Sequence, residues 1–360
     1  MHPPPRKLLF PATFFILLFS RPCSPARPFP DRLSAVELQN DVRNDTWRDF
    51  SKYLDAGMGS RVTGMSELKR YFNRFGYLPS SGSDSWTDDF DGEFKSAVIT
   101  YQKRLGLSVT GRLDSDTMST MMSPRCGVSD DPPPGVDIHT TRHYGYFYGR
   151  PRWNRSAPLI LTYTFSRDDM IDYLSMSDVR AAFEQAFSHW AAVIPVSFKE
   201  VYDSKGADIH IGFYSGNHGD GEAFDGVLGV LAHAFSPENG RFHLDAAETW
   251  AVDFKREKSK VAVDLESVAT HEIGHVLGLA HSSVKEAVMY PSLSPRTKKV
   301  DLRIDDVEGS QALYGKNPNF KLDNFLQSEN SSGNSIGASP ASLSLLTLAF
   351  IFVLVHLLNA

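Results

Sequence analysis

The sequence has few cysteines, no excess of basic residues and no internal repeat. Only Cys23 and Cys126 occur among 360 residues, which excludes a small scaffold held together by disulfides. The formal net charge is −6, which argues against nucleic acid as a partner. Apolar residues make up 41% and charged residues 22%, and these ordinary globular values exclude a disordered or collagen-like chain. The length suits two modest domains or one large one.

The first 26 residues are typical of a secretory signal peptide. Basic residues precede a short apolar run from Leu8 to Phe19, and small residues follow up to Ala26. A buried or interfacial helix is the alternative, and the run is short for a membrane span. Cleavage near Ala26 would remove Cys23 and leave Cys126 as the single cysteine.

The last residues form a second apolar run, from Leu343 to Leu358, behind a polar stretch of small residues. This order is typical of a glycolipid (GPI) anchor signal. A single transmembrane helix is the alternative, but the run is short and no Lys or Arg follows it. We expect a polar linker over 317–333, a removed signal over 334–360, and attachment at one of four residues: Ser331, Ser332, Gly333 or Asn334.

Three sequons fit a chain that enters the secretory pathway, at Asn44, Asn154 and Asn330. Together with the two ends of the chain, they predict a protein on the outer face of the plasma membrane. The third sequon overlaps the predicted anchor site.

Helical spacing of apolar residues predicts three short helices between residues 60 and 125, with Gly76 and Gly106 as stops and Asp114 as a cap. A proline-rich stretch at 132–134 marks a domain boundary. A second domain follows over 143–316. Its pattern predicts strands and helices that build a mixed sheet with helices packed on it, an α+β fold. The predicted strands are 159–165, 196–201, 208–213 and 227–235, and the predicted helices are 178–193, 265–277 and 305–314.

Histidine is abundant in the second domain, with seven of the twelve between His210 and His281. His271 and His275 are four residues apart, so on a helix they share a face and can bind one metal ion. Gly278 permits a sharp turn that can bring His281 in as a third ligand. Three protein ligands leave zinc one open position, which is the arrangement of a catalytic site.

Glu272 lies beside the first of these ligands and is not needed for coordination. A zinc ion makes water nucleophilic near neutral pH. Glu272 can accept the proton of that water and pass it to a leaving amine. The pattern therefore predicts hydrolysis of peptide bonds.

The stretch His271–His281 resembles the long zinc motif of the metzincins, and 287–291 resembles their Met-turn, with Met289 beneath the metal. Residues 124–130 resemble the cysteine switch of the matrix metalloproteinases, and the chain looks most like the plant branch of that family. The resemblance covers about residues 60–316. It implies a mixed, mostly parallel five-stranded sheet with three helices, preceded by a three-helix propeptide domain.

The resemblance also implies roles for the first domain and for further metal sites. Residues 27–142 would be an inhibitory propeptide with a peptidoglycan-binding-like module, and Cys126 the fourth zinc ligand in the zymogen. A buried free cysteine is the alternative for Cys126. Three imidazoles and one carboxylate would hold a structural zinc: His218, Asp220, His233 and His243. Calcium would bind to oxygen ligands at Asp225, Gly226, Leu228, Val230, Asp245 and Glu248.

These features predict a zymogen of a zinc endopeptidase, secreted and attached to the cell surface, with two zinc ions and calcium. Its partners would be extracellular protein substrates, an activating protease and, through a lipid anchor, the plasma membrane. A non-catalytic surface protein that keeps metals for structure is the alternative. A cell-wall glycan binder built on the three-helix module is a further alternative.

Overall fold

The computed structural model describes residues 50–79, 86–130, 143–323 and 325. The predicted signal peptide, the sequons at Asn44 and Asn330, and the anchor candidates at 331–334 lie outside these residues. Among the described residues, no helix combines the length and apolarity that crossing a membrane requires.

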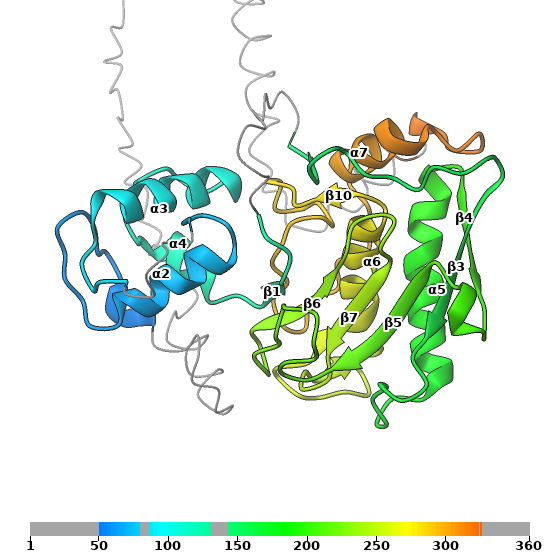
Figure 1. Cartoon of the computed structure of the whole chain (residues 1–360), viewed down its shortest axis with the longest axis horizontal. Helices are drawn as coiled ribbons and strands as arrows, with labels where there is room; N and C mark the ends of the chain where they lie inside the picture. The colour runs from blue at the N-terminus through cyan, green and yellow to red at the C-terminus, as the bar shows by residue number, and fades with distance from the viewer. Residues whose placement is uncertain (1–49, 80–85, 131–142, 324, 326–360) are drawn as a thin grey trace, which may run out of the picture. The chain divides into compact units, whose positions relative to one another are not determined.

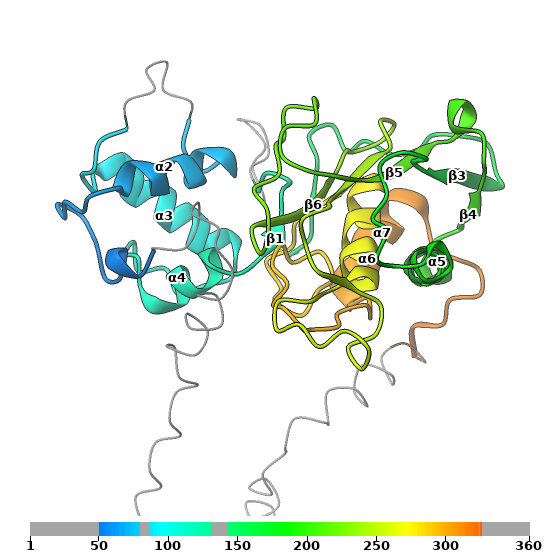
Figure 2. The same cartoon turned by 90° about the horizontal axis from the view of Figure 1, so that it is seen from below.

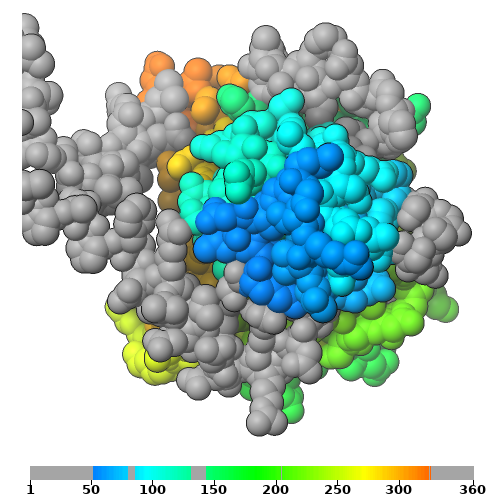
Figure 3. Space-filling view, turned by 90° about the vertical axis from the view of Figure 1, so that its left-hand side faces the viewer, coloured from blue at the N-terminus to red at the C-terminus, as the bar shows by residue number. Residues whose placement is uncertain are grey.

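The first part of the described chain is a helical module (Figures 1 and 3). Its buried core also includes Phe224, Val230 and Tyr290 from the second part of the chain. Asp91 and Asp114 cap the second and third of its α-helices, because their carboxylates accept bonds from backbone amides three residues ahead, at 2.8 and 2.9 Å. The three predicted helices are thus confirmed. Apolar side chains on their facing sides, such as Phe72 and Phe94, are fully buried. The elements are a 3-10 turn η1 (Phe50–Tyr53), α2 (Met65–Arg74), α3 (Gly92–Arg104) and α4 (Ser115–Met121).

The second part is built on a six-stranded sheet with the order β1-β6-β7-β5-β3-β4. All neighbouring strands run parallel except β6 and β7. Five strands belong to residues 143–316, which confirms the mixed, mostly parallel sheet. The sixth is β1, from the chain before the proline-rich boundary. The strands are β1 (Arg125–Cys126), β3 (Leu159–Phe165), β4 (Val196–Glu200), β5 (Ile209–Tyr214), β6 (Val230–Ala234) and β7 (Arg241–Asp245).

Two long helices, α5 (Met176–Val193) and α6 (Leu265–Val276), cover the same face of this sheet (Figures 1 and 2). Their apolar faces and the inner face of the sheet form one core, which includes Phe183, Trp190 and Ile273. A third helix, α7 (Ile304–Tyr314), completes the three that the family resemblance implies. Smaller elements are η2 (Ser204–Gly206) and two strand pairs, β2 (Gly145–Tyr146) with β10 (Leu279–Ala280) and β8 (Trp250–Ala251) with β9 (Val263–Asp264).

Strand β7 is absent from the strands that alternation alone predicts. Its five residues alternate polar and apolar, but all of them except Arg241 are buried, so its polar side does not face solvent as in a half-buried strand. The predicted strand over 227–235 is also shorter in the structure, where β6 begins at Val230. Residues before it form a loop in which Leu228 has a φ of +63°.

Candidate active site and metal centres

Helix α6 carries the first two predicted zinc ligands and is buried along its whole length. It begins after Asp264, whose carboxylate accepts bonds from the Ser267 amide at 2.8 Å and hydroxyl at 2.6 Å. After the helix, Gly278 has a φ of +104°, and a Cβ there would lie 2.2 Å from the carbonyl oxygen of Pro151. Only glycine fits this turn, which brings His281 back to the helix.

The three imidazoles converge through their Nε2 atoms. These atoms are 3.1 Å apart between His271 and His275, and 3.2 Å apart between His275 and His281. The Sγ atom of Cys126 lies 3.4 Å from His275 Nε2. A tetrahedral zinc site with ligands at 2.0–2.3 Å has edges of about 3.3 to 3.6 Å. The four side chains therefore fit a zinc ion in both chemistry and spacing.

Each imidazole donates its other N–H to an oxygen. His271 Nδ1 donates to the carbonyl of Val288 at 2.7 Å and His275 Nδ1 to the carbonyl of Leu279 at 2.8 Å. His281 Nδ1 donates to the carboxylate of Asp130 at 2.6 Å. These bonds fix the tautomer that leaves Nε2 free to bind a metal. Burial, followed by repulsion from the neighbouring imidazoles, holds the pKa of His271 and His275 well below the usual value, so both rings are neutral.

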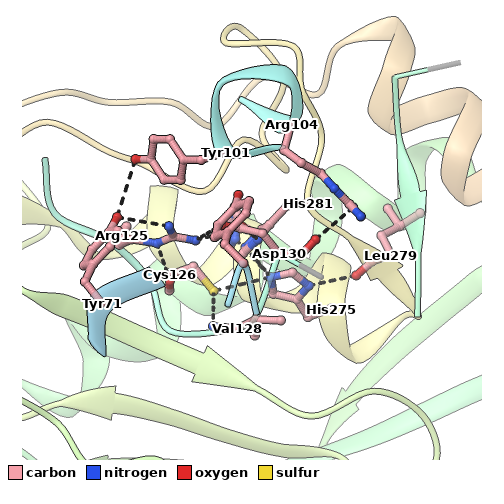
Figure 4. Close-up of polar contacts among 12 residues, drawn as sticks. Tyr71, Tyr101, Arg104, Arg125, Cys126, Val128, Asp130, His275, Leu279 and His281 are labelled. Carbon is pink, nitrogen blue, oxygen red and sulfur yellow. Dashed lines mark hydrogen bonds and ion pairs between the residues drawn. The ribbon is translucent and has the colours of Figure 1, made fainter. Parts of the chain in front are cut away.

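The segment around Cys126 pairs with β6 on one side and bonds the Met-turn on the other, and Figure 4 shows its contacts with His275 and Val128. The Cys126 amide donates to the carbonyl of Pro291 at 2.8 Å, and the Gly127 amide donates to the carbonyl of Ala232, also at 2.8 Å. Leu293 donates its amide to Pro124 at 3.0 Å. The segment therefore forms hydrogen bonds with backbone groups of β6 on one side of the cleft and with those of residues 291 and 293 on the other.

A buried ion pair holds this segment in place. Arg125 Nη2 lies 2.8 Å from both carboxylate oxygens of Asp130, and both side chains are at most 3% exposed. The Tyr77 hydroxyl donates to Asp130 at 2.8 Å, and the Arg125 guanidinium stacks 3.6 Å from the centre of the Phe75 ring. Burial opposes the charge on Asp130, but Arg125 and then His281 outweigh it and hold the pKa of Asp130 far below its usual value.

Glu272 lies beside the thiol and is fully buried. Neither carboxylate oxygen makes a hydrogen bond of ordinary geometry. Burial raises the pKa of Glu272 to about 8, and weak stabilisation by the Cys126 thiol and the Ala234 amide only partly offsets it. An unpartnered acid next to converging metal ligands is unusual in a folded core, and it suits a group that handles protons.

Met289 packs directly under helix α6 and is 1% exposed. A Cβ at Gly274 would lie only 2.2 Å from its Sδ atom, so the helix and the Met-turn are in close contact at this point. The turn is tied to α7, because the carboxylate of Asp306 accepts the amides of Val288 at 2.9 Å and Met289 at 3.0 Å.

The second histidine cluster also converges. One carboxylate oxygen of Asp220 lies 2.8 Å from His218 Nε2, 2.7 Å from His233 Nε2 and 2.8 Å from His243 Nδ1. All four ligand atoms lie within 4.8 Å of one another. This is the set predicted for a structural zinc, and the His233 Nδ1 atom on its far side has no hydrogen-bond partner.

The predicted calcium residues form a looser group. Asp245 and Glu248 are buried, and Glu248 Oε2 has no hydrogen-bond partner. Burial raises the pKa of Asp245 to about 6 and that of Glu248 well above its usual value; repulsion from Asp225 adds to both shifts, and repulsion from Asp245 adds to that of Glu248. Within the described ranges, their side-chain atoms do not converge as the zinc ligands do. A cation would instead share them with backbone carbonyls of the 226–230 loop, whose Leu228 amide bonds Glu248 at 2.6 Å.

Two further observations concern predicted residues. Asn154 is exposed on the segment before β3 and is therefore accessible to a glycan. Asn317, at the start of the predicted linker, packs on the catalytic part, because its side-chain amide donates to the carbonyl of Ala191 at 2.7 Å. The contact of Asp130 with His281, 151 residues away, had no signal in the spacing of the sequence.

Comparison with known proteins agrees with this site. The Matrixin family model matches residues 152–315, and a model for a peptidoglycan binding domain matches residues 61–121. The chain is 59% identical over 296 residues to Metalloendoproteinase 1-MMP of Arabidopsis thaliana, covering 81% of this chain and 80% of that protein. It is 43% identical over 277 residues to Metalloendoproteinase 1 of Glycine max, covering 74% and 87%. It is 35% identical over 266 residues to human Neutrophil collagenase, covering 73% and 52%.

The fold and the histidine-rich cleft are those of a zinc-dependent endopeptidase that acts on protein substrates. The chain belongs to the matrixin family, in its plant-type branch. Matrixins bind zinc and calcium, so both metals are cofactors of this class. Membership of this family of endopeptidases argues against the alternative of a non-catalytic surface protein.

Proposed function

We propose that the chain is the latent precursor of a secreted matrixin, and that Cys126 keeps it inactive. The observation that carries the proposal is the convergence of Cys126 Sγ with three imidazoles whose Nδ1 atoms are already bonded. A thiolate is a strong fourth ligand for zinc and leaves no position for water. The domain division, 27–142 as propeptide and 143–316 as catalytic domain, follows from this role.

The roles of the cleft residues in peptide hydrolysis follow from their positions. His271, His275 and His281 would hold the catalytic zinc, which supplies Lewis acidity toward the scissile carbonyl and lowers the pKa of water. Glu272 would accept a proton from the attacking water and transfer it to the departing nitrogen. Its burial favours this exchange, because the acid and its anion are close in free energy near neutral pH.

Substrate would bind where residues 124–130, the switch segment, now lie. Once residues 124–130 leave, the carbonyls of Ala232 and Pro291 and the amide of Leu293 lose their present partners. An extended peptide can bond the same groups by adding to the edge of the sheet at β6. The propeptide therefore blocks the metal and the substrate strand together.

Two variants test this function. Glu272→Ala should abolish peptide cleavage by the activated protein while its zinc content, measured by atomic absorption, stays the same. Glu308→Ala, at an exposed glutamate of α7, is the control and should retain full activity. Cleavage by Glu272→Ala at the wild-type rate would refute the assigned role.

The latency of the full chain is tested separately. Cys126→Ser should cleave peptides without a mercurial or a processing protease, because serine is a poor zinc ligand. Ser123→Ala, three residues away, should remain latent. A latent Cys126→Ser protein would contradict the switch.

We further propose that the mature enzyme is held on the outer face of the plasma membrane by a glycolipid anchor. The small residues at 331–334 and the apolar end of the chain support this. Phosphatidylinositol-specific phospholipase should release the protein from intact cells into the medium. Retention after treatment would favour a transmembrane helix or an anchor that resists the enzyme.

A further inference from the structure

A pocket lies beside the predicted catalytic residues and extends along α6. The space between its lining atoms, counted together with the open solvent at its mouth, is about 320 Å³. Cys126, His271 and Glu272 line one part of it, and Ser267 and Lys299 line another. Ser267 is four residues before His271 on the helix, about 6 Å along the axis. The Lys299 backbone amide donates to the Ser267 hydroxyl at 2.7 Å, which places the backbone of this lysine beside the first turn of α6.

The rest of the lining is mainly apolar. Leu231, Val268, Val288, Tyr290 and Leu293 are among the lining residues. Apolar groups of this kind pack well against methylene groups. Apart from the predicted catalytic residues, Lys299 is the one lining residue with a charged side chain, and Ser267 and Ser292 carry neutral hydroxyls.

The Lys299 ammonium has capacity to bind a further oxygen. It donates to the carbonyl of Lys285 at 2.7 Å and lies 5.2 Å from the centre of the Tyr290 ring. An ammonium has three N–H donors, and no carboxylate of the described ranges lies within ion-pair distance of it. Its neighbour Lys298, in contrast, bonds Glu266 at 2.6 Å. Burial lowers the pKa of Lys299 to about 8, which Asp306 and Glu286 only partly offset.

Resting on the proposed function, we propose that Lys299 is a specificity-determining residue of this pocket. Its ammonium would bind the terminal oxygen of a long substrate side chain, glutamine or glutamate, at the residue that follows the scissile bond. The methylene groups of that side chain would lie against the apolar wall. Glutamine would be accepted at least as well as glutamate, because a neutral amide loses less hydration on entering an apolar pocket than a carboxylate does.

The test uses the activated enzyme and four peptides that differ only in the residue after the scissile bond: Leu, Met, Gln or Glu. Lys299→Met should lower the ratio of kcat/KM for the Gln peptide to that for the Met peptide by about tenfold or more, as expected when a charged hydrogen bond is lost. Lys298→Met is the matched control and should leave the ratio unchanged. Lys299→Arg should keep most of the preference. An unchanged ratio in Lys299→Met overturns the inference.

A binding measurement separates this inference from the proposed function. The same peptides are titrated into activated Glu272→Ala protein, with and without Lys299→Met, and their Kd values are measured by calorimetry. The ratio of Kd for the Gln and Met peptides should again change about tenfold with Lys299→Met. If wild-type protein cleaves none of the peptides, the proposed function fails, while the Kd ratio still decides the role of Lys299.

Discussion

Replacement of Asp130 by asparagine should open the zymogen. In the latent protein, Asp130 accepts bonds from Arg125, Tyr77 and His281, and it is the carboxylate that neutralises a guanidinium only 3% exposed. Asparagine has a similar shape but carries no charge. Arg125 would therefore stay buried without its counter-ion, or leave its site and take the switch segment with it.

The size of the effect follows from the burial of the pair. Removing one partner of a buried ion pair costs about 3 to 5 kcal/mol. In the open form both side chains reach water, so nearly all of this cost falls on the closed form. At 1.4 kcal/mol for each factor of ten, the open fraction should rise about 100- to 3,000-fold. Tyr77→Phe removes one hydrogen bond to a charged group, worth about 1.5 to 3 kcal/mol, and should give a smaller increase.

The reactivity of the thiol measures this opening directly. Cys126 is 4% exposed, and without the signal peptide it is the only cysteine in the chain, so alkylation by a maleimide reports the open fraction. The labelling rate of the full-length proform should increase in the order wild type, Tyr77→Phe, Asp130→Asn. Peptide cleavage by the proform, measured without an activating protease, should increase in the same order. Asp116→Asn, at an exposed site on α4, should label as slowly as wild type. A labelling rate for Asp130→Asn within about threefold of wild type would refute the reasoning from buried-pair energetics.

Three further predictions concern stability, measured by unfolding of the full chain. Gly274→Ala should destabilise by about 1 kcal/mol or more, because overpacking against the Met289 sulfur at 2.2 Å exceeds the gain in helix propensity; in a Met289→Ala background it should be neutral or stabilising, and the same loss in both backgrounds would argue against the contact. Calcium at 100 times its Kd should stabilise by about 2.7 kcal/mol, or about 5 to 10 °C in Tm, and Asp245→Asn should remove most of this gain. Because the folded pKa of Asp306 is raised to about 6, its carboxyl binds its proton more tightly in the folded than in the unfolded chain. The free energy of folding that this tighter proton binding contributes is fully present below about pH 4 and is lost as the pH rises through 6. The stability advantage of wild type over Asp306→Asn should therefore fall by about 3 kcal/mol between pH 3.5 and 7. A difference that stays constant over this range would contradict the raised pKa.

The parts of the molecule that could be predicted from the sequence depend on short-range pattern. The four-residue spacing of His271 and His275 predicts helix α6 and its two metal ligands. Gly278 predicts the sharp turn that brings His281 back to them. Strand β7 alternates polar and apolar residues over only five positions, and its polar residues His243 and Asp245 are buried like the apolar ones. Its identification needed either the family resemblance or the fold itself.

The residues that could not be predicted act across long separations. Asp130 and His281 are 151 residues apart, and Tyr77 and Asp130 are 53 apart. Lys299 enters the pocket through a loop that no periodic pattern describes. A contact of this kind depends on how the domain packs, and neither residue type nor spacing distinguishes it from a solvated charge.

The switch segment combines three blocking contacts within seven residues. Its thiol lies 3.4 Å from His275 Nε2, where the fourth zinc ligand would bind. Its backbone pairs with β6, where we propose that substrate binds, and Asp130 accepts the N–H of His281. Because the three contacts share one short stretch of chain, breaking any one of them weakens the others, and their free energies should not add. Such coupling favours a switch that is either closed or open, with few partly open molecules. In the proposed secreted zymogen, the burial of Cys126, which is 4% exposed, would also protect this unpaired thiol from oxidation.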